Sequence, residues 1–216
     1  MFSYWIINLS FIVGISAIIG LVRIKKIQQA NYPFIVFLWI GFLNEIISEI
    51  SIFKFHTNAP NSNLYVLLST LVLIWQFKTW KLFDKQKKVF YLLLYFVLIS
   101  WVIENLLISS IFFFNSYTAV IYSFLIVMLS IHMISRLIFI KMEVLPKSST
   151  FLICFSFILM YTVRMLVEIF WIYGLDSSKS FQIHEYLLIS YVNLIVNIIN
   201  IIAVLWIPGK REFILH

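Results

Sequence analysis

Long runs of hydrophobic residues fill most of the chain, and short polar segments separate them. A helix needs about 20 such residues, at a rise of about 1.5 Å each, to cross the hydrocarbon core of a bilayer. Seven runs have roughly this length, at residues 4–22, 32–53, 63–80, 89–114, 118–140, 151–173 and 185–207. They are apolar on nearly all sides, unlike the alternating strands of a membrane β-barrel. The pattern therefore predicts an all-α polytopic membrane protein with seven transmembrane helices.

The composition supports a protein that lies almost wholly in lipid. Of its 216 residues 62% are hydrophobic and 12% are charged, whereas soluble domains carry about 25% charged residues. We therefore expect a single transmembrane domain over residues 1–216. Glycine and proline are scarce, which predicts mostly regular helices. The single cysteine, Cys154, lies in an apolar run and fits the role of a small buried hydrophobe.

The basic residues predict the orientation. Thirteen of the 16 fall in one set of alternate loops: Arg23, Lys25, Lys26, Lys78, Lys81, Lys85, Lys87, Lys88, Arg136, Lys141, Lys147, Lys210 and Arg211. Only Lys54 and Lys179 fall in the other set. Because cytoplasmic loops are enriched in Lys and Arg, the N-terminus is predicted outside and the C-terminus inside, in the cytoplasmic membrane of a bacterium. This distribution explains the net charge of +7 without a nucleic-acid partner.

The run at residues 151–173 carries two charges near its middle. Arg164 and Glu168 are four residues apart, so on a helix they share a face and can pair. A charge at this depth is unfavourable by about 2.5–3.5 kcal/mol on insertion scales. A functional or structural reason for the charges is therefore expected.

Other polar residues are predicted at a similar depth. At about 1.5 Å per residue, Glu45, Glu104 and Arg164 lie roughly 12–15 Å below the outer ends of their helices. The spacing of Asn193, Asn197 and Asn200 places them on one face of the last helix. We predict an outward-facing cavity lined by Glu45, Glu104, Arg164, Glu168, Asn193 and Asn197. Secondary candidates are Glu49, Asn105, Gln76, His132 and Asn200.

These charges do not balance, because four glutamates accompany one arginine. Three uncompensated carboxylates are unfavourable in a medium of low dielectric constant. A bound proton, cation or amine would relieve the imbalance, as would a ligand that hydrogen-bonds carboxyl groups. Alternatively, the same polar side chains simply hold helices together, as they do in many membrane proteins.

Several classes of membrane enzyme and pigment protein lack support. No run contains a central lysine for a retinal Schiff base, and His132 is the one histidine within a run, so no metal site is expected. The chain has no GxSxG, HExxH or glycine-rich phosphate motif, and no cofactor is expected. A non-enzymatic role is favoured, although Glu45 or Glu104 could act as a base in an intramembrane enzyme acting on lipids.

The chain resembles a family of small seven-span membrane proteins of unknown function that is common in Bacteroidota. The resemblance rests on the turn Asn115-Ser116-Tyr117-Thr118, on the aromatic end of the sixth run, and on the asparagine-rich segment NLIVNIINIIAVLWI. In the first half it rests on the acidic second run and on Asn63-Leu64-Tyr65. The family implies no catalytic residue. The plan also resembles the seven-span sensory modules of bacterial kinases and cyclases, and here any output would need a separate partner.

Two functions follow as hypotheses. The first is a receptor-like protein that binds a small ligand or cation in the cavity and acts through a membrane or cytoplasmic partner. The second is a small proton- or cation-coupled transporter with a parallel three-plus-one-plus-three repeat. FLNEIISEIS and YTVRMLVEIF align so that Glu45 matches Arg164, which favours the repeat. A pathway to the inner side near Gln76 and His132 would favour transport, whereas the lack of Gly or Pro breaks in the helices disfavours it.

Overall fold

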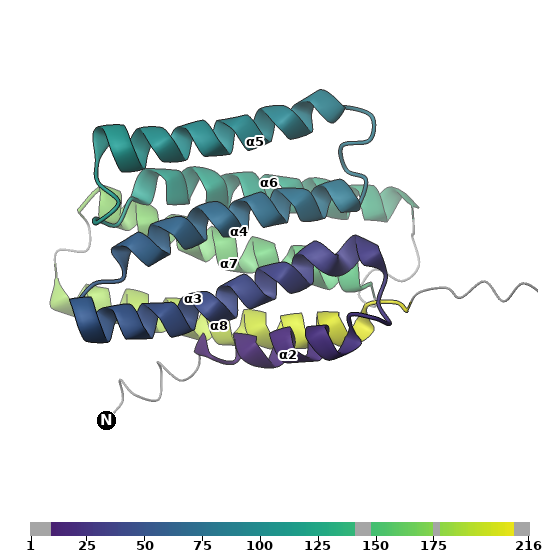
Figure 1. The fold of residues 1–216 in the computed structure, drawn as a ribbon, viewed down its shortest axis with the longest axis horizontal. Helices are drawn as coiled ribbons and strands as arrows, with labels where there is room; N and C mark the ends of the chain where they lie inside the picture. Colours follow the sequence, from purple (N-terminus) through teal and green to yellow (C-terminus); the bar gives the residue numbers. More distant parts are fainter. Residues whose placement is uncertain (1–9, 141–147, 175–177, 210–216) are drawn as a thin grey trace, which may run out of the picture.

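The computed structural model describes residues 10–140, 148–174 and 178–209, and helices make up nearly all of this part. The α-helices are α2 (Val13–Arg23), α3 (Tyr32–Phe55), α4 (Ala59–Thr79), α5 (Lys87–Val102), α6 (Ser116–Ile140), α7 (Ser149–Ile172) and α8 (Lys179–Trp206). They run back and forth along one common direction (Figure 1). The predicted all-α class is confirmed. Part of the first predicted span lies outside the described residues.

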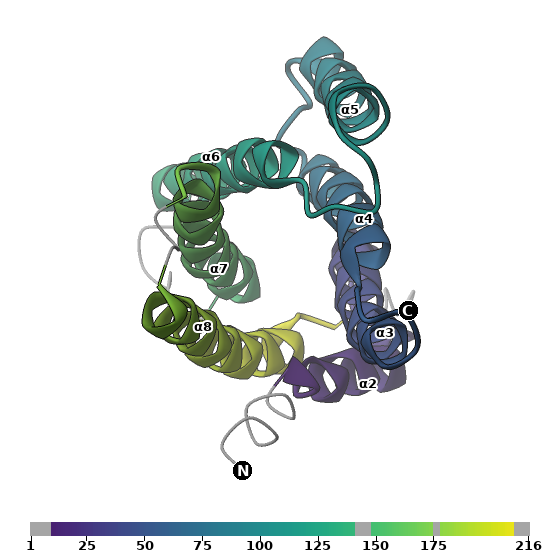
Figure 2. The ribbon, with the colours of Figure 1, turned by 90° about the vertical axis from the view of Figure 1, so that its left-hand side faces the viewer.

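Six of these helices form a closed ring. In ring order they are α2, α3, α4, α6, α7 and α8, and each contacts the next, with α8 contacting α2. Figure 2 shows this ring end-on. Helix α5 lies outside the ring, where it packs against α4 and α6. The polar side chains of the ring helices can therefore gather in a common interior.

The outer surface of the bundle is suited to lipid. Five helical segments within the described residues are long and apolar enough to cross a membrane: Gln29–Phe55, Lys87–Ile108, Ser116–Phe139, Ser149–Ile172 and Phe181–Trp206. In α5, only Phe90 and Val97 are buried, so most of its apolar side chains face outward. Helix α4 is also long, but it is less hydrophobic than these five segments. It carries the buried polar side chains of Asn63, Ser69, Thr70 and Gln76. The chain is a multi-pass integral membrane protein.

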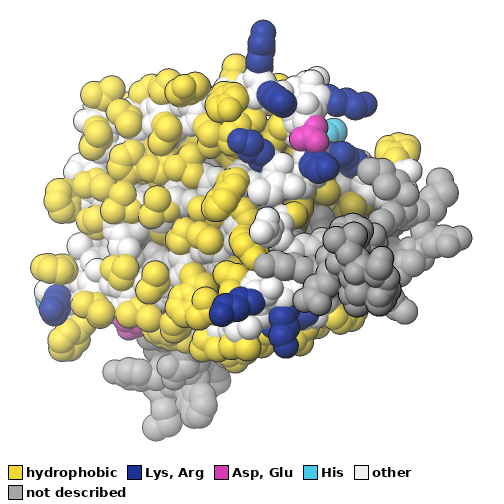
Figure 3. Space-filling view, turned by 45° about the vertical axis from the view of Figure 1, so that its right-hand side comes forward, with side chains coloured by type: hydrophobic (Ala, Val, Ile, Leu, Met, Phe, Trp, Pro, Cys, Tyr) yellow, Lys and Arg dark blue, Asp and Glu magenta, His cyan; other side chains and the backbone are white. Residues whose placement is uncertain are grey.

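The two ends of the bundle differ in charge. Figure 3 shows lysine and arginine side chains gathered where α2 and α4 end and α5 begins. These residues are Arg23, Lys25, Lys26, Lys78, Lys81, Lys85, Lys87, Lys88 and Arg136. We call this the basic end, and it lies on the right of Figure 1. The opposite end holds the junction of α3 with α4, including Lys54. The remaining predicted inner residues, from 141, 147 and the C-terminus, lie outside the described residues.

Helix α2 packs very closely against α3. Gly14, Ala17 and Gly20 lie on one face of α2, and all three are buried. A Cβ atom at Gly20 would lie 2.8 Å from the side chain of Ile35. Small residues allow such close approach of helices in membranes, where packing replaces the hydrophobic effect as the driving force.

Two predicted boundaries are wrong. The fourth run was expected to be helical to residue 114, but after α5 the chain forms a π-helix, η2 (Ile103–Ile108), and then leaves the helical conformation. The expectation of regular helices fails here because Glu104 and Asn105 make contacts outside their own helix. The polar loop expected at 54–62 is also shorter, because α4 already begins at Ala59. Pro60 lies in the first turn of α4. The N–H groups of a first turn have no acceptor within the helix, so the N–H that proline lacks is not missed there.

Candidate functional site

A cavity of about 310 Å³ lies inside the ring. Helices α3, α4, α7 and α8 line it, together with Ser10 and Val13 at the start of α2. Its polar lining consists of Ser10, Asn44, Glu45, Ser62, Tyr65, Tyr161, Arg164, Glu168, Asn193, Asn197 and Asn200. We call it the central cavity. Its volume lies at the lower end of the range of about 300–1,000 Å³ that is usual for small-molecule sites.

The central cavity brings together most of the residues predicted from the sequence. Glu45 comes from α3, Arg164 and Glu168 come from α7, and Asn193 and Asn197 come from α8. The secondary candidate Asn200 also lines it. In the ring, α7 and α3 are not neighbours but face each other. Charged groups of both signs therefore reach the same space from opposite walls.

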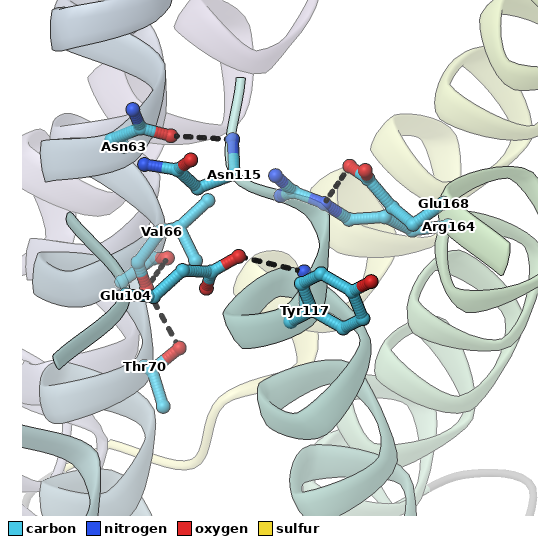
Figure 4. Close-up of polar contacts among 9 residues, drawn as sticks. Asn63, Val66, Thr70, Glu104, Asn115, Tyr117, Arg164 and Glu168 are labelled. Atoms are coloured by element: carbon cyan, nitrogen blue, oxygen red, sulfur yellow. Dashed lines mark hydrogen bonds and ion pairs between the residues drawn. The ribbon is translucent and has the colours of Figure 1, made fainter. Parts of the chain in front are cut away.

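Arg164 and Glu168 form a loose ion pair. The Arg164 Nε lies 3.8 Å from the Glu168 Oε1, and the two side chains are 20% and 24% exposed. In Figure 4 the Nη groups of Arg164 point away from Glu168. Because a close pair with carboxylate would use two parallel N–H groups at shorter range, the guanidinium keeps donors for another partner.

Glu45 lacks such a basic partner. Its carboxyl group is hydrogen-bonded by the Ser10 hydroxyl, and Glu49 is a second negative charge nearby. Among the described residues, Glu45 makes no ion pair. With Glu168 paired to Arg164, the central cavity keeps one unbalanced carboxyl group rather than the three inferred from the sequence.

The asparagines of α8 form a short polar ladder. The Asn197 side-chain amide donates to the Asn193 Oδ1 at 3.1 Å. Deeper in the bundle, the Ser156 hydroxyl of α7 donates to the Asn200 Oδ1 at 2.8 Å. Asn197 and Asn200 are buried, whereas Asn193 is partly exposed. Asn193 is thus the member best placed to contact a ligand, and Asn200 joins α8 to α7.

Glu104 lies elsewhere, so the expectation that it would meet Glu45 and Arg164 in one cavity is wrong. It is buried in η2, and it does not line the central cavity. Its carboxylate accepts the backbone N–H groups of Tyr117, at 3.0 Å, and Thr118, at 2.6 Å (Figure 4). These N–H groups belong to the first turn of α6, where unpaired donors and the helix dipole favour a negative charge. Glu104 therefore caps α6.

A network of amides surrounds this cap. The Asn115 side chain donates to the Asn105 Oδ1 at 2.8 Å. The Asn63 side chain of α4 donates to the carbonyl oxygens of Ile111, at 2.9 Å, and Phe113, at 2.7 Å. The secondary candidate Asn105 is thus a structural residue, as are Asn63 and Asn115. Their contacts bind the segment between η2 and α6 to the ring.

The other secondary candidates also lie outside the central cavity. Gln76 is fully buried, and it accepts the Phe34 N–H at 2.6 Å and donates to the Ala30 carbonyl oxygen at 2.7 Å. It therefore caps the start of α3. Glu49 and His132 are exposed on the outer faces of α3 and α6, so neither reaches the interior.

Sequence reasoning missed two tyrosines in the central cavity. Tyr65 of α4 and Tyr161 of α7 both line it, near Arg164. The hydroxyl of Tyr161 makes a side-chain hydrogen bond with Ser69. A signal was present for Tyr161, because it precedes Arg164 by three residues and so shares its helix face.

Comparison of the chain with known protein families, with curated proteins and with solved structures finds no match. The resemblance to the Bacteroidota membrane proteins stays a prediction, and the chemistry of the central cavity is the guide to function. Within residues 10–140, 148–174 and 178–209, no group of three or more His, Cys, Asp or Glu side chains is placed to hold a metal ion.

Proposed function

We propose that the protein is a seven-span membrane protein that binds a small polar ligand in the central cavity. The unbalanced carboxyl group of Glu45, facing Arg164 across the cavity, carries this proposal. The gathering of Lys and Arg at the basic end supports an orientation with that end in the cytoplasm. A bacterial cytoplasmic membrane is the location that we propose.

The cavity favours a ligand with a positively charged amine. A single negative charge at Glu45 suits one ammonium group, while the Arg164 Nη groups and the Asn193 amide suit an acceptor at the other end of the ligand. Val163 and Val167 add apolar walls. A few polar groups that converge in a mainly apolar space are typical of small-molecule sites.

Glu45→Gln tests whether the carboxyl group serves binding or helix association. A partly buried carboxylate without a cationic partner is unfavourable for folding, and residues that serve binding often reduce stability. We therefore expect Glu45→Gln to leave the melting temperature of the purified protein unchanged or to raise it. Thermal unfolding in detergent measures this, with Glu49→Gln, one turn further along α3 and exposed, as the matched control. A fall of several degrees for Glu45→Gln alone would mean that Glu45 holds helices together.

Both a receptor and a transporter would use such a binding site. A receptor passes the binding event to a partner protein, whereas a transporter moves the ligand across the bilayer. The ring consists of two successive three-helix groups, α2-α3-α4 and α6-α7-α8, with the same order of contacts, which favours the transporter, with the receptor as the alternative. The lipid-acting enzyme gains no support, because Glu45 faces the interior of the ring and Glu104 caps α6.

A further inference from the structure

We propose that the protein is a carrier whose two halves open in turn, passing the ligand from the central cavity to a second chamber at the basic end. This inference rests on the proposed function, because the ligand in the central cavity is the cargo.

The ring divides into two halves of equal construction. The first consists of α2, α3 and α4, and the second of α6, α7 and α8, with α5 as the connecting helix outside the ring (Figure 2). In each half the first helix contacts the second and the second contacts the third. The two seams between the halves are also equivalent, since α4 contacts α6 and α8 contacts α2. This order of contacts is the one that a two-fold axis along the ring would produce, as in transporters with parallel repeats.

Arginine contacts at the two seams join equivalent pairs of helices. Arg23, the last residue of α2, donates to the carbonyl oxygens of Val204 and Ile207 at the end of α8. Arg136, in the last turns of α6, donates to the carbonyl oxygen of Lys81 just beyond α4. In both cases the first helix of one half holds the end of the last helix of the other half. This agreement is independent of the alignment of Glu45 with Arg164.

A second cavity, of about 420 Å³, lies at the basic end. We call it the inner chamber. Equivalent residues of the two halves line it, because the alignment that matches Glu45 with Arg164 also matches Asn31 with Thr150. Trp80 and Trp206 also line it, each at the end of the last ring helix of its half. The inner chamber is therefore lined from both halves of the ring. Gln76 and His132, near which a pathway would have favoured transport, do not line it.

Four aromatic rings, three of them buried and Phe37 partly buried, pack together beside the central cavity, and we take them as the barrier between the two cavities. Phe157 of α7 lies 6.0 Å from Phe34 and 5.5 Å from Phe37 of α3, and 6.5 Å from Phe77 of α4, between ring centroids. Phe34 and Phe77 are 0% exposed and Phe157 is 2% exposed. Asn31, which lines the inner chamber, and Phe37, which lines the central cavity, are six residues apart, or about 9 Å at ~1.5 Å per residue. We call these four rings the aromatic layer.

The aromatic layer is formed across the interface of the two halves. Phe157 belongs to the second half, whereas Phe34, Phe37 and Phe77 belong to the first. A rocking of one half against the other would separate Phe157 from these three rings and join the central cavity to the inner chamber. The structure thus shows the state that is closed toward the basic end.

Cysteine accessibility tests this inference without knowledge of the cargo. The single native cysteine, Cys154, is fully buried, and Cys154→Ala provides the background. Asn193→Cys places a thiol in the central cavity. The probe is a membrane-impermeant methanethiosulfonate with a trimethylammonium group, applied to either side of lipid vesicles that hold the full chain. We expect labelling from both sides, because the cavity opens to each in turn.

Matched positions establish which side the reagent reaches. Lys85→Cys should be labelled only from the basic end and Lys54→Cys only from the opposite end, while Ile198→Cys, on the outer face of α8, should resist labelling. Asn193→Cys labelled only from the opposite end would overturn the carrier and leave the binding site in place. No labelling of Asn193→Cys from either side would contradict both the carrier and the ligand cavity.

The aromatic layer gives a second test. Adding Phe157→Ala should raise the rate at which Asn193→Cys is labelled from the basic end by about tenfold, since the rate follows the population of the open state. The rate from the opposite end should not rise. Phe157→Leu, which keeps most of the volume, should behave like the parent. Equal rates for Phe157→Ala and the parent from the basic end would exclude the aromatic layer as the barrier. Misfolding caused by Phe157→Ala would be detected as labelling of Ile198→Cys when the two substitutions are combined.

Discussion

Glu104→Ala is expected to lower the free energy of unfolding by about 3 kcal/mol, because hydrogen bonds to a charged group contribute about 1.5–3 kcal/mol each. The substitution would leave the N–H groups of Tyr117 and Thr118 without their acceptor. Water cannot replace it easily, since Glu104 is only 5% exposed. Thermal or denaturant unfolding of the purified protein in detergent measures the loss.

The controls for Glu104 separate charge from shape. Glu104→Gln keeps one acceptor oxygen, so an intermediate loss is expected. Glu49→Ala removes an exposed carboxyl group and should change stability by less than about 0.5 kcal/mol. If Glu104→Ala were as stable as Glu49→Ala, the carboxylate would not be the cap of α6, and a ligand-binding role for Glu104 would return.

Gln76→Leu is expected to destabilise the protein by about 1–3 kcal/mol, because the buried N–H of Phe34 would lose its acceptor. The Ala30 carbonyl oxygen would keep the Thr79 hydroxyl as a donor. The side chain of Gln76 pairs the N–H of Phe34 and the carbonyl oxygen of Ala30. Leucine matches it in size but offers neither a donor nor an acceptor. The aromatic layer should also loosen, since Phe34 belongs to it.

The measurement for Gln76 is again the unfolding transition, together with labelling of Asn193→Cys from the basic end. Gln86→Leu is the matched control, because Gln86 is exposed between α4 and α5. The control should unfold like the parent. A Gln76→Leu protein with parental stability would show that the start of α3 does not depend on this cap.

The helices could be predicted from the sequence because lipid imposes a simple rule. Backbone groups in the hydrocarbon must pair within their own segment, so a long apolar run becomes a helix almost regardless of its neighbours. The end of the fourth run could not be predicted in this way. There the chain leaves the helix because Glu104 and Asn105 find partners in α6 and at Asn115, and such contacts depend on the tertiary fold. The seven-span count and the orientation stay predictions.

The candidate site could be predicted in part, because regular helices give each residue a predictable depth. Depth along a helix follows from residue number, and it placed Glu45, Arg164 and Asn193 at compatible levels, which agrees with the central cavity. Depth does not determine in which direction a side chain points or where its helix lies in the bundle. Glu104 has a similar depth but belongs to the helical segment outside the ring, so its side chain reaches the start of α6 instead of the cavity.

The repeat was only weakly visible in the sequence. One short alignment, matching Glu45 with Arg164, pointed to it. Apolar segments resemble one another because lipid selects the same few residues, so similarity in composition carries little information about duplication. Our proposal of two equivalent halves rests instead on the order of helices around the ring and on the contacts of Arg23 and Arg136.

An experimental structure of the purified protein in lipid, at a resolution that shows small molecules, tests the central claim most directly. The region to inspect lies between Glu45, Arg164 and Asn193. We expect an open cavity that contains discrete density for a small polar molecule, with a basic group near Glu45. Side chains packed directly on one another, with Arg164 bound to Glu45 and no space between α3 and α7, would contradict the claim and show these charges to be structural contacts between helices.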